Sequence, residues 1–147
     1  MQEDSYAFKR TSEVYHYEFY SEGPKGVIRK VVQFHLIDET NYVFNLAFGD
    51  WDEKKEELND KIATNNKDRQ KVLATVAKTV LDFIKTHPAA TVVAKGSTAS
   101  RTRLYQMGIA AFWDEINELF YIDGYIDDHW ESFRSKRNYE AFLLERK

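Results

Sequence analysis

The residues best suited to chemistry lie in one short segment, Gly96–Arg103. There a short apolar run gives way to a helical pattern, with one glycine, hydroxyl side chains and two arginines at the junction. Backbone N–H groups at the start of a helix attract anions, and the helix dipole adds to the attraction. A guanidinium binds phosphate or carboxylate through paired hydrogen bonds. The segment therefore predicts a site for an anionic small molecule. The residues assigned to it are Gly96, Ser97, Thr98, Ser100, Arg101, Arg103 and Tyr105.

The same segment also fits a purely structural role. Ser97 or Thr98 can cap the helix, Gly96 can make the turn, and the arginines can pair with acidic groups. On a regular helix two residues that are two positions apart point roughly 200° from each other. One anion would therefore not reach both Arg101 and Arg103. The spacing matches neither a P-loop nor a dinucleotide-binding fingerprint, so both interpretations stay open.

Two acidic clusters in the sequence are expected to be ordinary solvated surface. Two acidic groups lack the spacing of a calcium loop or a zinc site, so we expect no metal and no cofactor. They are Asp50, Asp52 and Glu53, and Asp123, Asp127 and Asp128 with His129.

Two histidines and one basic loop complete the candidates. His16 and His35 are expected to share a sheet face, where a general base is conceivable but has no nucleophile beside it. A basic loop over 134–137, interleaved with aromatic residues, could stack and neutralise a nucleic acid strand. A solvated loop is the simpler interpretation.

Composition limits the function classes. The 147 residues suit one domain, 1–147, and the 21 basic and 24 acidic side chains leave a net charge of −3. That balance does not favour nucleic acid as a partner, although a local basic patch leaves room for one. The chain has no cysteine, its first residues are polar rather than signal-like, and no apolar run could span a bilayer. We expect a cytoplasmic protein without membrane contact. Aromatic residues make up 15% of the chain, which suits a core, a stacking surface or a homodimer interface.

Hydrophobic periodicity predicts an α+β fold with the element order β-β-β-α-β-α-β-β. Two main helices should pack on one face of a mostly antiparallel sheet. The predicted helices span 67–86, with Asn65 or Asn66 as the cap, and 100–119. The region 52–68 should be a solvated connection. The predicted strands span 14–21, 27–37, 42–48, 90–95, 120–126 and 139–144.

Six stretches form a familiar combination. They are Gly23-Pro24-Lys25-Gly26, Phe44–Asp50, Asn65-Asn66-x-Asp68, Val72–Val76, Gly96–Tyr105 and Asn138–Phe142. Together they resemble an uncharacterised family of small bacterial proteins, and Gly96–Tyr105 is the most specific part. The resemblance covers most of the chain and implies a stand-alone bacterial cytosolic protein. It implies no activity.

The element order also resembles that of the GNAT acyltransferases, in which a tyrosine near the last helix often donates a proton. Tyr105 would be the matching residue. GNAT domains hold the coenzyme A pyrophosphate on a glycine-rich loop between the central strand and the next helix. Here that junction, Gly49–Asn66, is long, charged and without a second glycine. The resemblance implies an acyltransferase as an alternative function, and fold alone does not establish it.

Overall fold

A computed structural model describes residues 4–11, 15–59 and 64–147 and has an α+β architecture. One open sheet has the strand order β1-β2-β3-β4-β6-β9-β7-β8, and β5 pairs with the far end of β4. Every pairing is antiparallel except that of β4 with β6. The strands are β1 (Lys9–Arg10), β2 (His16–Gly23), β3 (Gly26–Asp38), β4 (Val43–Asp52), β5 (Glu57–Asn59), β6 (Thr91–Ala94), β7 (Phe120–Ile126), β8 (His129–Ser132) and β9 (Ala141–Arg146).

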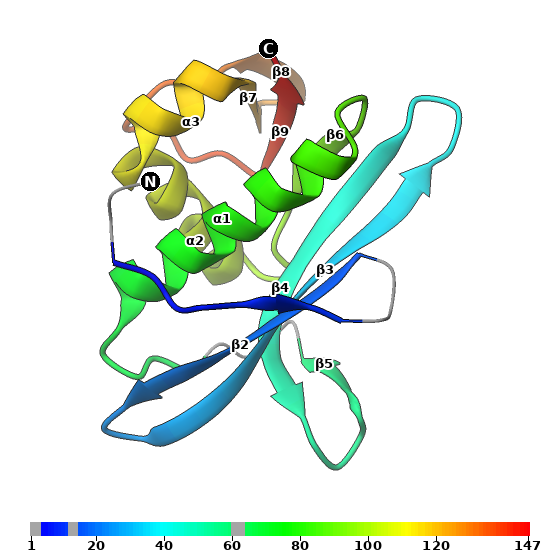
Figure 1. Ribbon diagram of the computed structural model, residues 1–147. Coiled ribbons are helices and arrows are strands. Elements are labelled where there is room, and N and C mark those ends of the chain that lie inside the picture. Colours follow the sequence, from blue (N-terminus) through cyan, green and yellow to red (C-terminus); the bar gives the residue numbers. More distant parts are fainter. Residues whose placement is uncertain (1–3, 12–14, 60–63) are drawn as a thin grey trace.

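One face of this sheet carries the core. In β4 the alternate residues Phe44, Leu46 and Phe48 are buried, and the strand register places the buried residues of the neighbouring strands on the same face. The helices cover that face, and α1 crosses it diagonally (Figure 1). This is the predicted arrangement, because antiparallel sheets commonly pack one face and leave the other in water.

The first helix, α1 (Arg69–Thr86), has the apolar stripe that its sequence predicts. Its start differs from the prediction: Asp68 occupies the N-cap position and makes no side-chain cap bond. Asn65 accepts a hydrogen bond from the amide of Lys67 (3.0 Å), and Asn66 is buried beneath the β2–β3 turn. The prediction that Asn65 or Asn66 caps this helix was therefore wrong.

The second predicted helix is two helices, α2 (Ala99–Ala111) and α3 (Trp113–Leu119). The break falls at Phe112, whose backbone leaves helical geometry (φ −114°, ψ 28°). The Phe112 side chain is 2% exposed. Phe112 packs into the core at the point where the chain passes from α2 to α3. The apolar periodicity of the sequence continues across this break, so the sequence predicted one helix.

Three short strands, β1, β5 and β8, were not predicted, because two to four residues show little periodicity. The strand β4 also runs on to Asp52 and pairs there with β5 inside the region expected to be a solvated connection. Residues 60–63 of that region, and Val14 of the first predicted strand, lie outside the described residues. Across the described ranges, no helix is long and apolar enough to cross a bilayer.

Candidate functional site

The turn from β6 into α2 is built on Gly96. The Gly96 amide donates to Thr102 Oγ1 (3.0 Å), which brings the turn against the helix. A Cβ on Gly96 would lie 2.4 Å from Arg101 Cβ and from the Thr102 amide nitrogen. Thr98 is the N-cap, and its Oγ1 accepts from the Arg101 amide (3.2 Å). Glycine is required because the chain approaches its own helix too closely for any side chain.

Arg101 faces the interior and is 4% exposed. Its Nη2 donates to the carbonyl of Phe48, and its guanidinium lies 5.0 Å from the centre of the Phe48 ring. The strands β4 and β6 pair only over 43–46 and 91–94, and β4 then has no strand partner on that side until β5 pairs with it from Asp50. Arg101 therefore binds a β4 carbonyl just beyond the point where β6 has ended, which satisfies a backbone acceptor that burial would otherwise penalise.

A groove of about 390 Å³ opens on the other side of the start of α2. We call it the α2 groove. It brings together four of the predicted site residues, Gly96, Ser97, Thr98 and Arg103, and adds Lys95. Its remaining lining consists of Ala99, Thr102, Gln106, Asn138, Tyr139 and Glu140.

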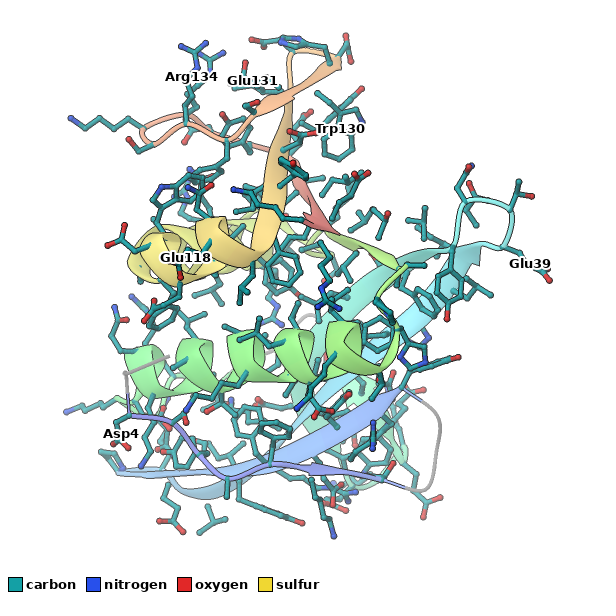
Figure 2. The ribbon with its side chains drawn as sticks, turned by 45° about the horizontal axis from the view of Figure 1, so that its top comes forward. Asp4, Glu39, Glu118, Trp130, Glu131 and Arg134 are labelled. Atoms are coloured by element: carbon teal, nitrogen blue, oxygen red, sulfur yellow. The ribbon has the colours of Figure 1, made fainter. Side chains whose placement is uncertain are left out.

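The far wall of the groove is held in place by Tyr139. Its ring lies flat against Gly124, where a Cβ would come within 2.3 Å of Cδ1. Its hydroxyl donates to Glu131 Oε2 (2.7 Å) and accepts from the Arg134 amide (2.9 Å). Burial raises the pKa of Tyr139, and the bond to Glu131 raises it further. Figure 2 shows Glu131 and Arg134 together at this end of the molecule.

Gln106 ties this wall to α2. Its Nε2 donates to the Arg137 carbonyl (2.5 Å), and its Oε1 accepts from the Tyr139 amide (3.4 Å). The two walls, distant in sequence, are thus joined through one amide side chain. The groove is therefore fixed on both sides rather than formed by one loop.

Residues 2–147 match the model of a protein family of unknown function (DUF6934). The chain belongs to this family. No curated protein and no solved structure matches the chain significantly. The predicted membership of an uncharacterised family is confirmed, and no activity comes with it.

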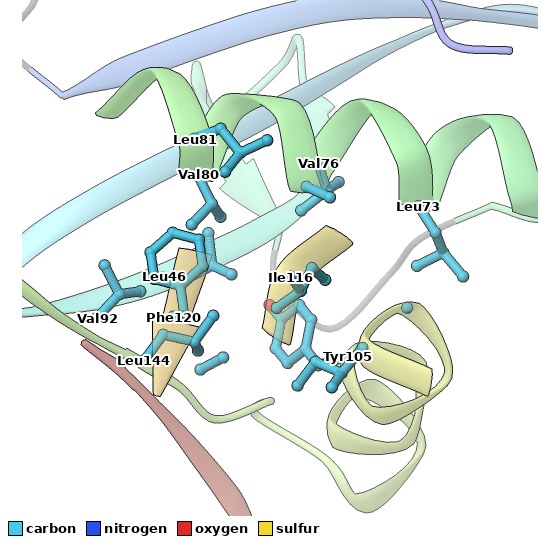
Figure 3. A pocket seen from close by; sticks show the side chains of 14 residues that line it. Leu46, Leu73, Val76, Val80, Leu81, Val92, Tyr105, Ile116, Phe120 and Leu144 are labelled. Atoms are coloured by element: carbon cyan, nitrogen blue, oxygen red, sulfur yellow. The ribbon is translucent and has the colours of Figure 1, made fainter. Parts of the chain in front are cut away.

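In this DUF6934 protein the other three predicted site residues, Ser100, Arg101 and Tyr105, do not line the groove. Ser100 is exposed on the first turn of α2. Tyr105 is 8% exposed and lines an apolar cavity of about 60 Å³ between the helices and the sheet (Figure 3). Leu73, Val76 and Ile116 surround it there. Tyr105 thus belongs to the core side of α2, as does Arg101.

The weaker sequence candidates have structural partners. His16 and His35 do share a sheet face, and Gln33 joins them, with its Nε2 3.1 Å from His16 Nδ1 and its Oε1 3.1 Å from His35 Nε2. Asp50 pairs with buried Lys30, and Asp52 accepts the amides of the following turn. Within the described chain, no three metal-binding side chains gather into a cluster.

Sequence reasoning missed Lys95, Gln106 and the wall formed by 138–140 as lining of the groove. Lys95 directly precedes the predicted segment, so including the end of the strand would have found it. The wall lies more than thirty residues further along the chain. Only the pairing of β9 with β6 brings it beside Gly96.

Proposed function

We propose that the DUF6934 protein binds an anionic, phosphate-bearing small molecule in the α2 groove. The observation that carries the proposal is that Lys95 and Arg103 line the same groove as the start of α2. The first amides of the helix, those of Ala99 and Ser100, have no acceptor within the helix itself. Two cationic side chains and the positive end of a helix dipole therefore favour one negative group at this place.

The opposite wall suggests what the rest of the ligand is. Asn138 and Glu140 are exposed and line the groove, so they can bind hydroxyl or amino groups. The Glu140 carboxylate would repel a second negative group. The volume lies within the usual range for small-molecule sites, roughly 300–1,000 Å³. A sugar phosphate or a nucleoside monophosphate has this combination of one anionic end and a polar remainder.

The test is a titration followed by amide NMR. Inorganic phosphate and a nucleoside monophosphate are added to the full chain, and the amides of Ser97–Ser100 are expected to shift. Arg103→Ala should weaken binding about tenfold, the effect of losing one charge-assisted hydrogen bond. Lys55→Ala removes a cation from an exposed turn that does not line the groove, and it serves as the control. Equal affinities in the two variants would refute the proposal.

The cellular location of the protein, and the alternative functions as an acyltransferase or a homodimer, stay predictions. The absence of cysteine and the resemblance to small bacterial proteins support a bacterial, cytosolic protein. An acyltransferase would need its coenzyme to enter beside β4, where Arg101 now lies. A homodimer would use exposed aromatic residues such as Tyr121 (62% exposed). Acetyl-coenzyme A in a thermal-shift assay and light scattering would test these two alternatives.

A further inference from the structure

A second recess opens at the start of α1, on the Arg101 side of α2. We call it the Lys30 chamber. It has a volume of about 80 Å³, with Lys30, Phe48 and Leu104 among its lining residues. That volume accommodates a few ordered waters or a ligand of about four to six heavy atoms.

Lys30 is the unusual member of this lining, because a lysine that is 1% exposed is rare. Its Nζ donates to Asp50 Oδ1 (2.5 Å) and to the Thr64 carbonyl (3.0 Å). An ammonium group has three donors, and within the described ranges these two bonds use two of them, so one is left on a lysine that lines the chamber. Asp50 is fixed in turn, because its Oδ2 accepts from both the amide (3.1 Å) and the hydroxyl (2.6 Å) of Thr64.

The rest of the chamber divides into apolar walls and a charged mouth. Phe48, Val72 and Leu104 supply apolar surface. Arg69 lines both the chamber and a wider cleft of about 620 Å³ outside it, as does Asp68. Asp4 lies beside this first turn of α1, 3.6 Å from Lys71 (Figure 2). The chamber is therefore reached from the surface past an arginine.

We propose that the Lys30 chamber binds a short-chain monocarboxylate. The carboxylate accepts a hydrogen bond from the third N–H of the Lys30 ammonium group, and the positive charge of Arg69 stabilises it further. The hydrocarbon chain packs on Val72 and Leu104. Asp68 also lines the chamber, and the repulsion from its carboxylate grows with the charge of the ligand, so a monoanion is favoured over a dicarboxylate or a phosphate dianion.

The experiment titrates the full chain with sodium butyrate and, at the same ionic strength, with sodium chloride. Amide NMR should show saturable shifts at Thr64 and Arg69 with butyrate only. Each methylene removed, through propionate to acetate, should weaken binding about fourfold. Shifts that are equal in chloride, or that do not depend on chain length, would overturn the proposal.

Two variants make the test specific. Leu104→Phe fills the chamber, and Arg69→Gln removes the exposed cation without touching the buried pair. Each should weaken butyrate binding about tenfold, while Lys85→Gln, a change in the last turn of α1, should not. Unchanged affinity in both Leu104→Phe and Arg69→Gln would refute the site. Arg103→Ala should leave butyrate binding intact and Arg69→Gln should leave phosphate binding intact, so failure of one site is distinguishable from failure of the other.

Discussion

Two arginines on α2, two residues apart, lie in opposite environments. Arg101 is buried against β4 and donates to the Phe48 carbonyl, whereas Arg103 is exposed and lines the α2 groove. The same residue type thus holds the helix to the sheet on one side and presents a cation to solvent on the other. The comparison teaches that a cluster of arginines in sequence is not one site. The helical rotation between neighbours separates their roles.

The largest expected effect comes from Arg101→Ala. It removes a buried hydrogen bond and leaves a cavity beside Phe48, so we expect a loss of about 2–4 kcal/mol in the free energy of unfolding. Urea denaturation followed by circular dichroism measures it. Phosphate affinity of the folded fraction should stay the same. A stable variant that no longer binds phosphate would place Arg101 in the ligand site and reverse the comparison.

Gly96→Ala should come next. The added Cβ would lie 2.4 Å from Arg101 Cβ, so the turn must move away from α2. Overpacking of this kind costs about 1–3 kcal/mol. Thermal unfolding measures this loss of stability. Gly26→Ala is unsuitable as a control, because Gly26 has a positive φ of 90° and alanine there would be strained for a different reason. Gly108→Ala, where the added Cβ would lie no closer than 3.6 Å to Leu73 Cδ2, is the better control. If Gly96→Ala does not change the thermal stability, the turn is not packed tightly against α2.

Thr98→Ala removes the side-chain acceptor at the N-cap. The helix start then loses about 1 kcal/mol. Thr98→Ser keeps the hydroxyl and should retain most of that stability in the same denaturation experiment. If the alanine and serine variants unfold at the same urea concentration, the cap contributes nothing, and contacts such as the Gly96–Thr102 and Arg101–Phe48 hydrogen bonds hold the start of α2.

The smallest effect on stability is expected from Arg103→Ala. An exposed side chain away from buried contacts changes the free energy of unfolding by less than about 0.5 kcal/mol. The variant therefore sharpens the contrast with Arg101→Ala when both are unfolded under the same conditions. A large loss of stability would mean that Arg103, too, holds the fold together.

The alternation of Phe44, Leu46 and Phe48 and the stripe on α1 were readable from the sequence, because burial on one face imposes a period of two or 3.6. The order of the main elements followed from them. The short strands were not readable, because they depend on a neighbour for pairing rather than on their own pattern. The break at Phe112 was hidden for a related reason: an apolar side chain keeps the period even where the backbone turns.

The candidate site shows the same division. By itself the sequence determined that 96–103 opens a helix with hydroxyl and cationic side chains, and that its two arginines diverge. Only the tertiary structure decided which arginine is buried, because that depends on where β6 stops beside β4. It also decided the far wall of the groove, through the pairing of β9 with β6, and it placed Lys30 beneath the start of α1. These are contacts between residues far apart in the chain, and no local pattern encodes them.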